Sequence, residues 1–223
     1  MRTVVDVWLA TPVAAGRLDP QRLSPADRAA WDSIRSPRRR VDWGSSRALL
    51  DAVPATGRSR SLSHSRGYAA LAVTDDALSI GIDVEWLAPR EFLSLAELAF
   101  DPGEVVGLES LRDPATIRAG FYETWTMKEA FAKALRLPLA AALRECTRTF
   151  AGGADTLRLP TDQPWRAAVY APRPELRLAL AVVGGAVADA APEVHTMEWP
   201  PAAVAHWPIV QQWQGEGRPG RPC

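Results

Sequence analysis

The chain has 223 residues, equal numbers of basic and acidic side chains (26 each), and a hydrophobic content of 47%. Zero net charge argues against a nucleic-acid-binding or anionic-membrane-binding protein, and this length and hydrophobic content suit one domain or two small lobes. No apolar stretch reaches the ~18 residues of a membrane span. Cys146 and Cys223 are too few for a disulfide framework or a zinc site. We therefore expect a cytoplasmic protein with neither a membrane nor a nucleic-acid partner.

Hydrophobic spacing predicts helices mixed with short strands. In chain order, the pattern indicates a strand at 4–10, helices at 24–34 and 37–52, strands at 61–65, 68–73 and 80–86, a helix at 91–100, a short helix from 104, a long helix at 114–135, and strands at 146–150, 167–170 and 176–183. Residues 200–213 show no clear pattern, and the Gly- and Pro-rich end at 214–223 is expected to be disordered. These elements predict the α+β class.

The predicted strand at 80–86 alternates between apolar and polar or small residues. Asp83 and Glu85 are two residues apart, so their carboxylates lie side by side on one face, and Gly81 leaves room there for a ligand or another backbone. Two adjacent carboxylates repel each other, and Mg²⁺, which binds carboxylates together with substrate phosphate oxygens, would relieve this. The alternative is an exposed strand face with two solvated acids.

The predicted long helix carries Trp125, Glu129 and Lys133 at spacings of four residues, which places them along one row at the edge of its apolar face. Glu129 and Lys133 could equally be an ordinary surface ion pair, and Lys128 a solvated side chain.

Three segments in this order and spacing resemble the signature motifs of the 4'-phosphopantetheinyl transferases. They read SHS at 63–65, GIDVE at 81–85 and WTMKEAFAK at 125–133. The likeness is closest to the larger, pseudo-dimeric type that activates nonribosomal peptide and polyketide synthases, and it runs from about Leu23 to Leu139.

The resemblance implies a fold of two similar lobes in one chain, each a small antiparallel sheet with helices, related by a pseudo-two-fold axis. The active site would lie between the lobes. We expect an N-terminal lobe at 1–88, a C-terminal lobe at 89–200 and a tail at 201–223. Two lobes in one chain would make a monomer sufficient.

The resemblance also implies a reaction, in which the 4'-phosphopantetheine arm of coenzyme A moves to a serine of an apo acyl or peptidyl carrier protein. Adenosine 3',5'-bisphosphate is released. By position, Asp83, Glu85 and Glu129 would hold Mg²⁺ on the coenzyme A pyrophosphate, and Mn²⁺ shares the same oxygen ligands. Glu129 and Lys133 would act directly in catalysis, Lys133 by stabilising charge on the phosphates.

Further contacts with coenzyme A follow from the same comparison. Lys128 would be a second phosphate contact, while Ser63, His64 and Arg47 would meet the 3'-phosphate. Relatives carry a Gly-Lys-Pro-like adenine loop that is shortened here, and Arg58 stands near its expected place. This departure leaves open a second hypothesis, a non-catalytic coenzyme A-binding protein.

Glu104 matches the position of a carboxylate proposed to activate the attacking serine in relatives. A glutamate at this point could instead stabilise the start of a helix, where negative charge is favourable. The sequence leaves both interpretations open.

Overall fold

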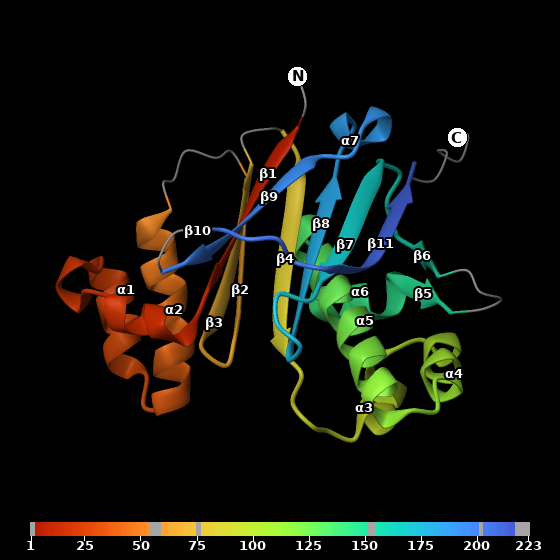
Figure 1. Cartoon of the computed structure of the whole chain (residues 1–223), viewed down its shortest axis with the longest axis horizontal. Helices are drawn as coiled ribbons and strands as arrows, with labels where there is room; N and C mark the ends of the chain where they lie inside the picture. The colour runs from red at the N-terminus through yellow and green to blue at the C-terminus, as the bar shows by residue number, and fades with distance from the viewer. Residues whose placement is uncertain (1–2, 54–58, 75–76, 151–154, 201–202, 217–223) are drawn as a thin grey trace.

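The chain repeats one structural plan, in which a strand is followed by helices and then by a hairpin that returns to the strand (Figure 1). The computed structural model describes residues 3–53, 59–74, 77–150, 155–200 and 203–216. The first lobe consists of β1 (Val4–Ala10), the 3-10 helices η1 (Pro12–Arg17) and η2 (Pro20–Arg22), α1 (Pro25–Ser33), α2 (Pro37–Ala52), β2 (Ser59–Ser65) and β3 (Tyr68–Thr74). Because β3 pairs antiparallel with both β1 and β2, the strand order is β1-β3-β2.

The second lobe follows the same plan. It consists of β4 (Ser79–Trp86), α3 (Phe92–Ala99), α4 (Pro102–Ser110), α5 (Pro114–Ala134), α6 (Leu139–Glu145), the small β5 (Thr147–Thr149) and β6 (Thr156–Arg158), β7 (Trp165–Tyr170) and β8 (Leu176–Val183). β8 pairs antiparallel with β4 and β7, so the order β4-β8-β7 matches that of the first lobe. The prediction of an α+β fold with two similar lobes is confirmed.

The remaining strands return to both sheets. They follow a short helix, α7 (Ala186–Asp189), and are β9 (Glu193–Trp199), β10 (Ala203–Val204) and β11 (Ile209–Gly215). β9 pairs parallel with β1 and antiparallel with β10, whereas β11 pairs antiparallel with β7. The first sheet is therefore β10-β9-β1-β3-β2, and the second is β11-β7-β8-β4.

These strand pairings correct the predicted boundaries. β4 is the first strand of the second lobe, because its backbone partner is β8, so the expected lobe boundary at residue 88 is wrong. Residues 203–204 and 209–215 of the expected tail are part of the sheets, since β10 pairs with β9 and β11 completes the second sheet. Gln214 and Gly215, expected to be disordered, belong to β11, and residues 217–223 lie outside the described part of the chain.

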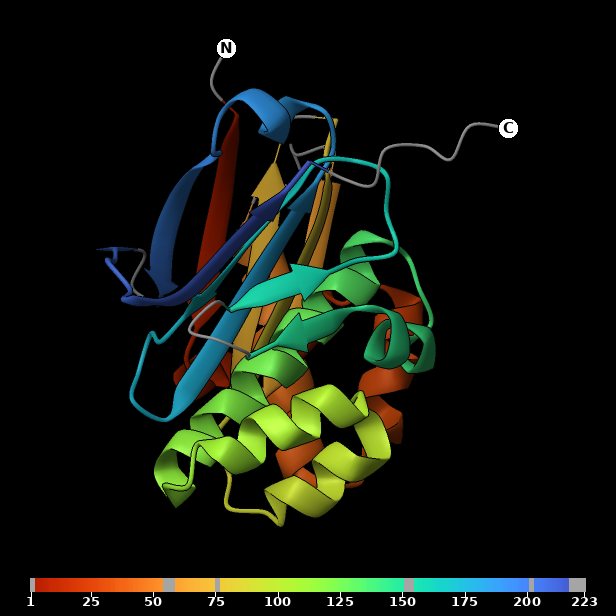
Figure 2. The same cartoon turned by 90° about the vertical axis from the view of Figure 1, so that its right-hand side faces the viewer.

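The molecule is built in layers, with α2 against the first sheet, the two sheets against each other, and α5 against the second sheet. Figure 2, viewed from the side of the second lobe, shows α3, α4 and α5 gathered below the strands. The layer between the sheets is formed by apolar residues from β1, β3, β4 and β8, such as Val7, Ile82 and Leu180. Burial of these apolar faces is the main force that joins the lobes.

Local sequence fixes where the helices begin. α1, α2, α4 and α5 each start with a Ser or Asp side chain that accepts a backbone N–H, followed directly by proline. The side chain satisfies an amide that the helix leaves unpaired, and proline suits the first helical position. Among the described residues, no helix combines the length and apolar character that a membrane crossing requires.

Candidate active site

The two sheets meet at their edges, where side chains of β2 bind the backbone of β4. Residues two apart in a strand share a face, so three serines of β2 line up toward this edge. Each accepts a backbone N–H of β4: Ser61 from Ile82 at 2.9 Å, Ser63 from Val84 at 3.3 Å, and Ser65 from Trp86 at 3.2 Å. The serine row thus joins the lobes where a backbone ladder would otherwise run.

Asp83 lies at this junction and is only 2% exposed. Its Oδ1 atom accepts hydrogen bonds from Ser63 Oγ at 2.6 Å and from Lys133 Nζ at 2.8 Å. Its Oδ2 atom is buried and has no hydrogen-bond partner among the described residues. Burial raises the pKa of Asp83 although the Lys133 ammonium opposes the shift. A buried carboxylate oxygen without a partner is costly, and a bound cation would satisfy it.

α5 reaches Asp83 because β4 carries a glycine at the crossing. A Cβ atom on Gly81 would lie 1.8 Å from the carbonyl oxygen of Ala130 and 2.7 Å from the nitrogen of Ala134. The sequence predicted room beside Gly81 for a ligand or for another backbone, and in the structure the backbone of α5 fills it. The close packing brings Glu129 and Lys133 of α5 beside the strand.

Trp125, Glu129 and Lys133 are half-buried, as the predicted row along the edge of the apolar face requires. Lys133 Nζ donates to the carbonyl oxygen of Ile82 at 2.8 Å as well as to Asp83, and so ties α5 to β4. Burial, followed by the charge of Asp83, raises the pKa of Glu129 to about 7. The site therefore concentrates negative charge in a poorly solvated place.

Glu85 completes the acidic group and is half-buried. Its Oε2 atom accepts a hydrogen bond from Ser65 Oγ at 2.7 Å, and burial raises its pKa. Among the described residues, no three Asp, Glu, His or Cys side chains form a ready-made metal cluster. Mg²⁺ is usually held by one or two carboxylates plus substrate phosphates. The donor set includes one carboxylate oxygen that has no partner in the described part of the chain, and it fits such a shared site.

The pKa of Glu129 predicts how metal affinity depends on pH. Below about 7 the carboxyl is protonated, and a cation must displace that proton to bind, so affinity should rise about tenfold per pH unit from 5.5 to 6.5 and level off above 7.5. Titration with Mn²⁺, followed by electron paramagnetic resonance at each pH, would measure this. The Glu129→Gln variant should bind more weakly and lose the dependence near pH 7. Equal affinity of the unaltered protein at pH 6 and 8 would contradict the prediction.

Comparison with known proteins singles out the lobe that carries these acids. Residues 79–181 match a family model described as "4'-phosphopantetheinyl transferase superfamily". The matched residues begin at the first residue of β4 and end within β8, so they cover almost the whole second lobe. The second lobe is therefore similar to members of the 4'-phosphopantetheinyl transferase superfamily.

Two curated proteins are similar to part of the chain. The 4'-phosphopantetheinyl transferase psf-1 of Bacillus pumilus is 36% identical over 131 residues, which are 57% of this chain and 54% of that protein. A Synechocystis sp. protein named "Putative 4'-phosphopantetheinyl transferase slr0495" is 34% identical over 85 residues, or 38% of this chain and 34% of that protein. The matches thus span about half and a third of the relatives' lengths.

Glu104 and Lys128 lie within the residues that match the family model but are shielded from solvent, at 1% and 0% exposure. Glu104 Oε2 accepts from Lys128 Nζ at 2.6 Å and from the backbone of Asp101 at 2.9 Å, while Oε1 accepts from the backbone of Arg148 at 2.7 Å. The bond from the backbone of Asp101 belongs to the capping box of α4. Of the two interpretations of Glu104, the structure favours the helix start over the catalytic base.

The enclosed ammonium of Lys128 also corrects a prediction. Lys128 donates to the carbonyl oxygen of Leu143 at 2.7 Å and lies over the ring of Phe100. A side chain with no exposed surface offers no contact to a phosphate, so the expected phosphate-binding role of Lys128 is not supported. Burial lowers its pKa although Glu104 opposes the shift.

The residues predicted for the 3'-phosphate of coenzyme A are spread over the first lobe. Ser63 faces Asp83, whereas His64, as its neighbour in the strand, faces the opposite way and is exposed. Arg47 of α2 pairs with Asp27 at 3.0 Å. Arg58, expected near the adenine loop and not at the 3'-phosphate, lies outside the described residues. The 3'-phosphate contacts stay predictions.

Ser65 is the last residue of the SHS segment at 63–65. The sequence predicts no role for Ser65, and the structure places it against Glu85. The sequence does carry a sign of this contact, because serine occurs at every second residue from 61 to 65. Asp83 and Glu85 on β4 have the same two-residue spacing.

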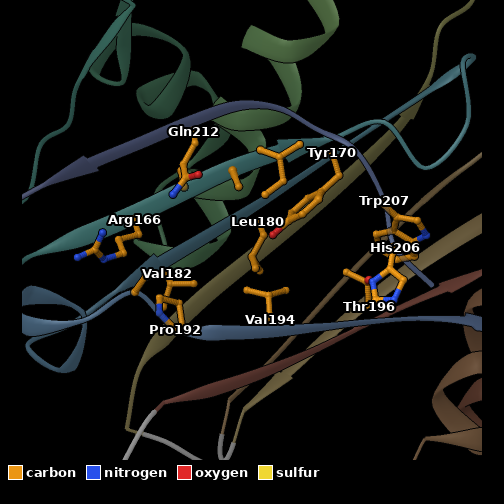
Figure 3. A pocket seen from close by; sticks show the side chains of 14 residues that line it. Arg166, Tyr170, Leu180, Val182, Pro192, Val194, Thr196, His206, Trp207 and Gln212 are labelled. Atoms are coloured by element: carbon orange, nitrogen blue, oxygen red, sulfur yellow. The ribbon is translucent and has the colours of Figure 1, made fainter. Parts of the chain in front are cut away.

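A separate cavity of about 340 Å³ lies between β9 and the second sheet (Figure 3). Leu180 and Val182, which line it, point away from α5, since their neighbours Ala179 and Ala181 pack on that helix. None of the described residues around this cavity is acidic. It is therefore distinct from the acidic site.

Proposed function

We propose that this protein transfers the 4'-phosphopantetheine arm of coenzyme A to a serine of an apo acyl or peptidyl carrier protein, with Mg²⁺ as cofactor. The observation that carries the proposal is the buried Oδ2 atom of Asp83, which has no partner among the described residues. It lies near Glu85, Glu129 and Lys133, in the lobe that matches the transferase superfamily. Such a group of carboxylates with a lysine suits a cation on a pyrophosphate.

In this reaction the serine oxygen of the carrier forms a bond to the phosphorus that bears the pantetheine arm. The bond from that phosphorus to the oxygen bridging the pyrophosphate breaks, adenosine 3',5'-bisphosphate leaves, and the serine proton passes to water. Phosphoryl transfer depends mainly on positioning and on neutralising charge, so ordered carboxylates and a lysine suffice as protein groups.

Each site residue has a defined task. Asp83, Glu85 and Glu129 would hold Mg²⁺, which when bound polarises the phosphate oxygens. Lys133 uses two of its three ammonium protons on Ile82 and Asp83, so one remains for a phosphate oxygen. The pair with Asp83 also keeps the ammonium in place before substrate arrives.

A cavity of about 170 Å³ next to Glu85 is a suitable place for the pantetheine arm. It combines apolar side chains with Arg90 and Glu85, and the arm likewise combines methyl groups with amides. The residues that line it are Glu85, Arg90, Leu95, Leu98, Ala99, Phe121, Tyr122 and Trp125. Leu98 is 87% exposed at its rim, where an incoming carrier protein would approach.

Intact-protein mass spectrometry of an apo carrier protein tests the proposal. With the protein, coenzyme A and Mg²⁺, the carrier should gain one phosphopantetheinyl group, and Asp83→Asn should slow this at least about 100-fold because the metal loses its buried ligand. EDTA should act in the same way. Asp6→Asn, the same change in the first strand of the first lobe, is the matched control and should keep its rate.

The same samples distinguish the transferase from the alternative, a non-catalytic coenzyme A-binding protein. Coenzyme A bound to the protein without any mass gain across several carriers would favour it. The observation behind this alternative is the shortened segment before Ser63, which falls on residues 54–58, outside the described part of the chain.

A further inference from the structure

The serines that join the sheets also bind the carboxylates of the acidic site. Ser63 Oγ accepts the N–H of Val84 and donates to Asp83 Oδ1 at 2.6 Å. Ser65 Oγ accepts the N–H of Trp86 and donates to Glu85 Oε2 at 2.7 Å. Each hydroxyl therefore has a fixed backbone donor on one side and a carboxylate on the other.

Ser61, the first serine of the row, has the backbone donor but no carboxylate of β4 beside it. It accepts the N–H of Ile82 at 2.9 Å, but the β4 residue at the corresponding place before that amide is Gly81, which has no side chain. Among the described residues, the row thus contains two serines that touch carboxylates and one that only joins the strands.

The geometry explains how a hydroxyl can orient a carboxylate. A serine oxygen that accepts a backbone N–H has its proton left to donate elsewhere, and here the nearest acceptor is the carboxylate. The bond from Ser63 directs Oδ1 of Asp83 toward protein donors and leaves Oδ2 available to a ligand, since Oδ2 has no partner among the described residues. Outer partners of this kind typically change metal affinity 10–100-fold when they are removed.

We propose that Ser63 and Ser65 are positioning residues that hold Asp83 and Glu85 in the orientation needed to bind a divalent cation. This inference rests on the proposed function, because it assigns those two carboxylates to the metal. The hydroxyls act through the carboxylates and need not touch the cation. The same serines join the lobes, so the orientation of the metal ligands depends on the two sheets being in register.

Mn²⁺ binding, measured by electron paramagnetic resonance on the full chain without coenzyme A, tests the proposal. Ser65→Ala should bind Mn²⁺ at least about tenfold more weakly than the unaltered protein. Ser61→Ala is the matched control, since it also removes one serine acceptor from the sheet junction, and its affinity should stay within about twofold. Ser65→Thr keeps the hydroxyl and should restore binding.

Thermal unfolding of each variant separates orientation from general damage. Ser61→Ala and Ser65→Ala should lower the melting temperature by similar amounts, because each leaves one backbone N–H of β4 without its acceptor. Equal Mn²⁺ affinity in these two variants would overturn the proposal, and so would a Ser65→Thr variant as weak as Ser65→Ala. If the unaltered protein bound no Mn²⁺, the metal site itself would be refuted, a result distinct from equal affinity among the variants.

Discussion

Glu104→Gln is expected to lower the free energy of unfolding by about 3–5 kcal/mol, the usual cost of leaving one partner of a buried ion pair alone. Lys128 is fully enclosed, and Glu104 is its charged partner at 2.6 Å. Glutamine is nearly the same size and can still accept from the backbone of Arg148, so the loss would come from the charge. Urea unfolding followed by circular dichroism would measure it.

The double variant Glu104→Gln/Lys128→Met is the control. Removing both charges should restore at least half of the lost stability, because replacing a buried ion pair with uncharged groups is often close to neutral. Unchanged stability of Glu104→Gln, combined with slow transfer and intact coenzyme A binding, would instead support Glu104 as the catalytic base.

Gly81→Ala is expected to cost about 3 kcal/mol of stability, the upper end of the range for overpacking, because the new methyl would meet backbone. A side chain could rotate away, but the carbonyl oxygen of Ala130, 1.8 Å from the new Cβ, moves only if α5 moves. Gly185→Ala is the matched control, since a Cβ there has no neighbour within 4 Å. Thermal unfolding of both variants would compare them.

The same substitution should reduce carrier modification even in protein that remains folded. Moving α5 outward takes Glu129 and Lys133 away from Asp83, and misplacement of about 1 Å can cost about 100-fold in rate. Phosphopantetheinylation should therefore fall for Gly81→Ala and stay unchanged for Gly185→Ala. A stable, fully active Gly81→Ala protein would show that α5 and β4 need not pack this closely.

The sequence predicted the parts of the fold that carry their own periodicity. The alternation at 80–86 and the helical spacing at 114–135 match β4 and α5 to within a residue. Burial of one face produces such patterns directly. The sequence also predicted that Asp83 and Glu85 share one face of the strand and that Glu129 lies at the edge of the apolar face of the helix. Strand and helix geometry each fix which side chains share a face.

β9 and β11 were missed because neither shows a clean alternation. β9 contains Glu193, His195 and Glu198, and β11 is rich in glutamine, so neither resembles a buried strand. β9 and β11 are held in place by pairing with the edge strands β1 and β7. The periodicity of a single sequence does not show which strand another strand pairs with.

The role of Lys128 was missed for a related reason. Lysine and glutamate are almost always exposed, so a sequence pattern assigns them to the surface or to a ligand. Here Lys128 and Glu104 are 24 residues apart and meet inside the lobe. Only tertiary packing brings these opposite charges together.

The pairing of β9 with β1 has a consequence for synthesis on the ribosome. Val4 pairs with Glu193, so β1 gains this neighbour only after all the residues between β1 and β9 have been translated. Such contacts between distant residues form slowly, because the entropy cost of closing a long loop comes before the stabilising contacts can form. Until then the nascent first sheet presents an open edge at β1, the kind of edge that invites pairing with other chains.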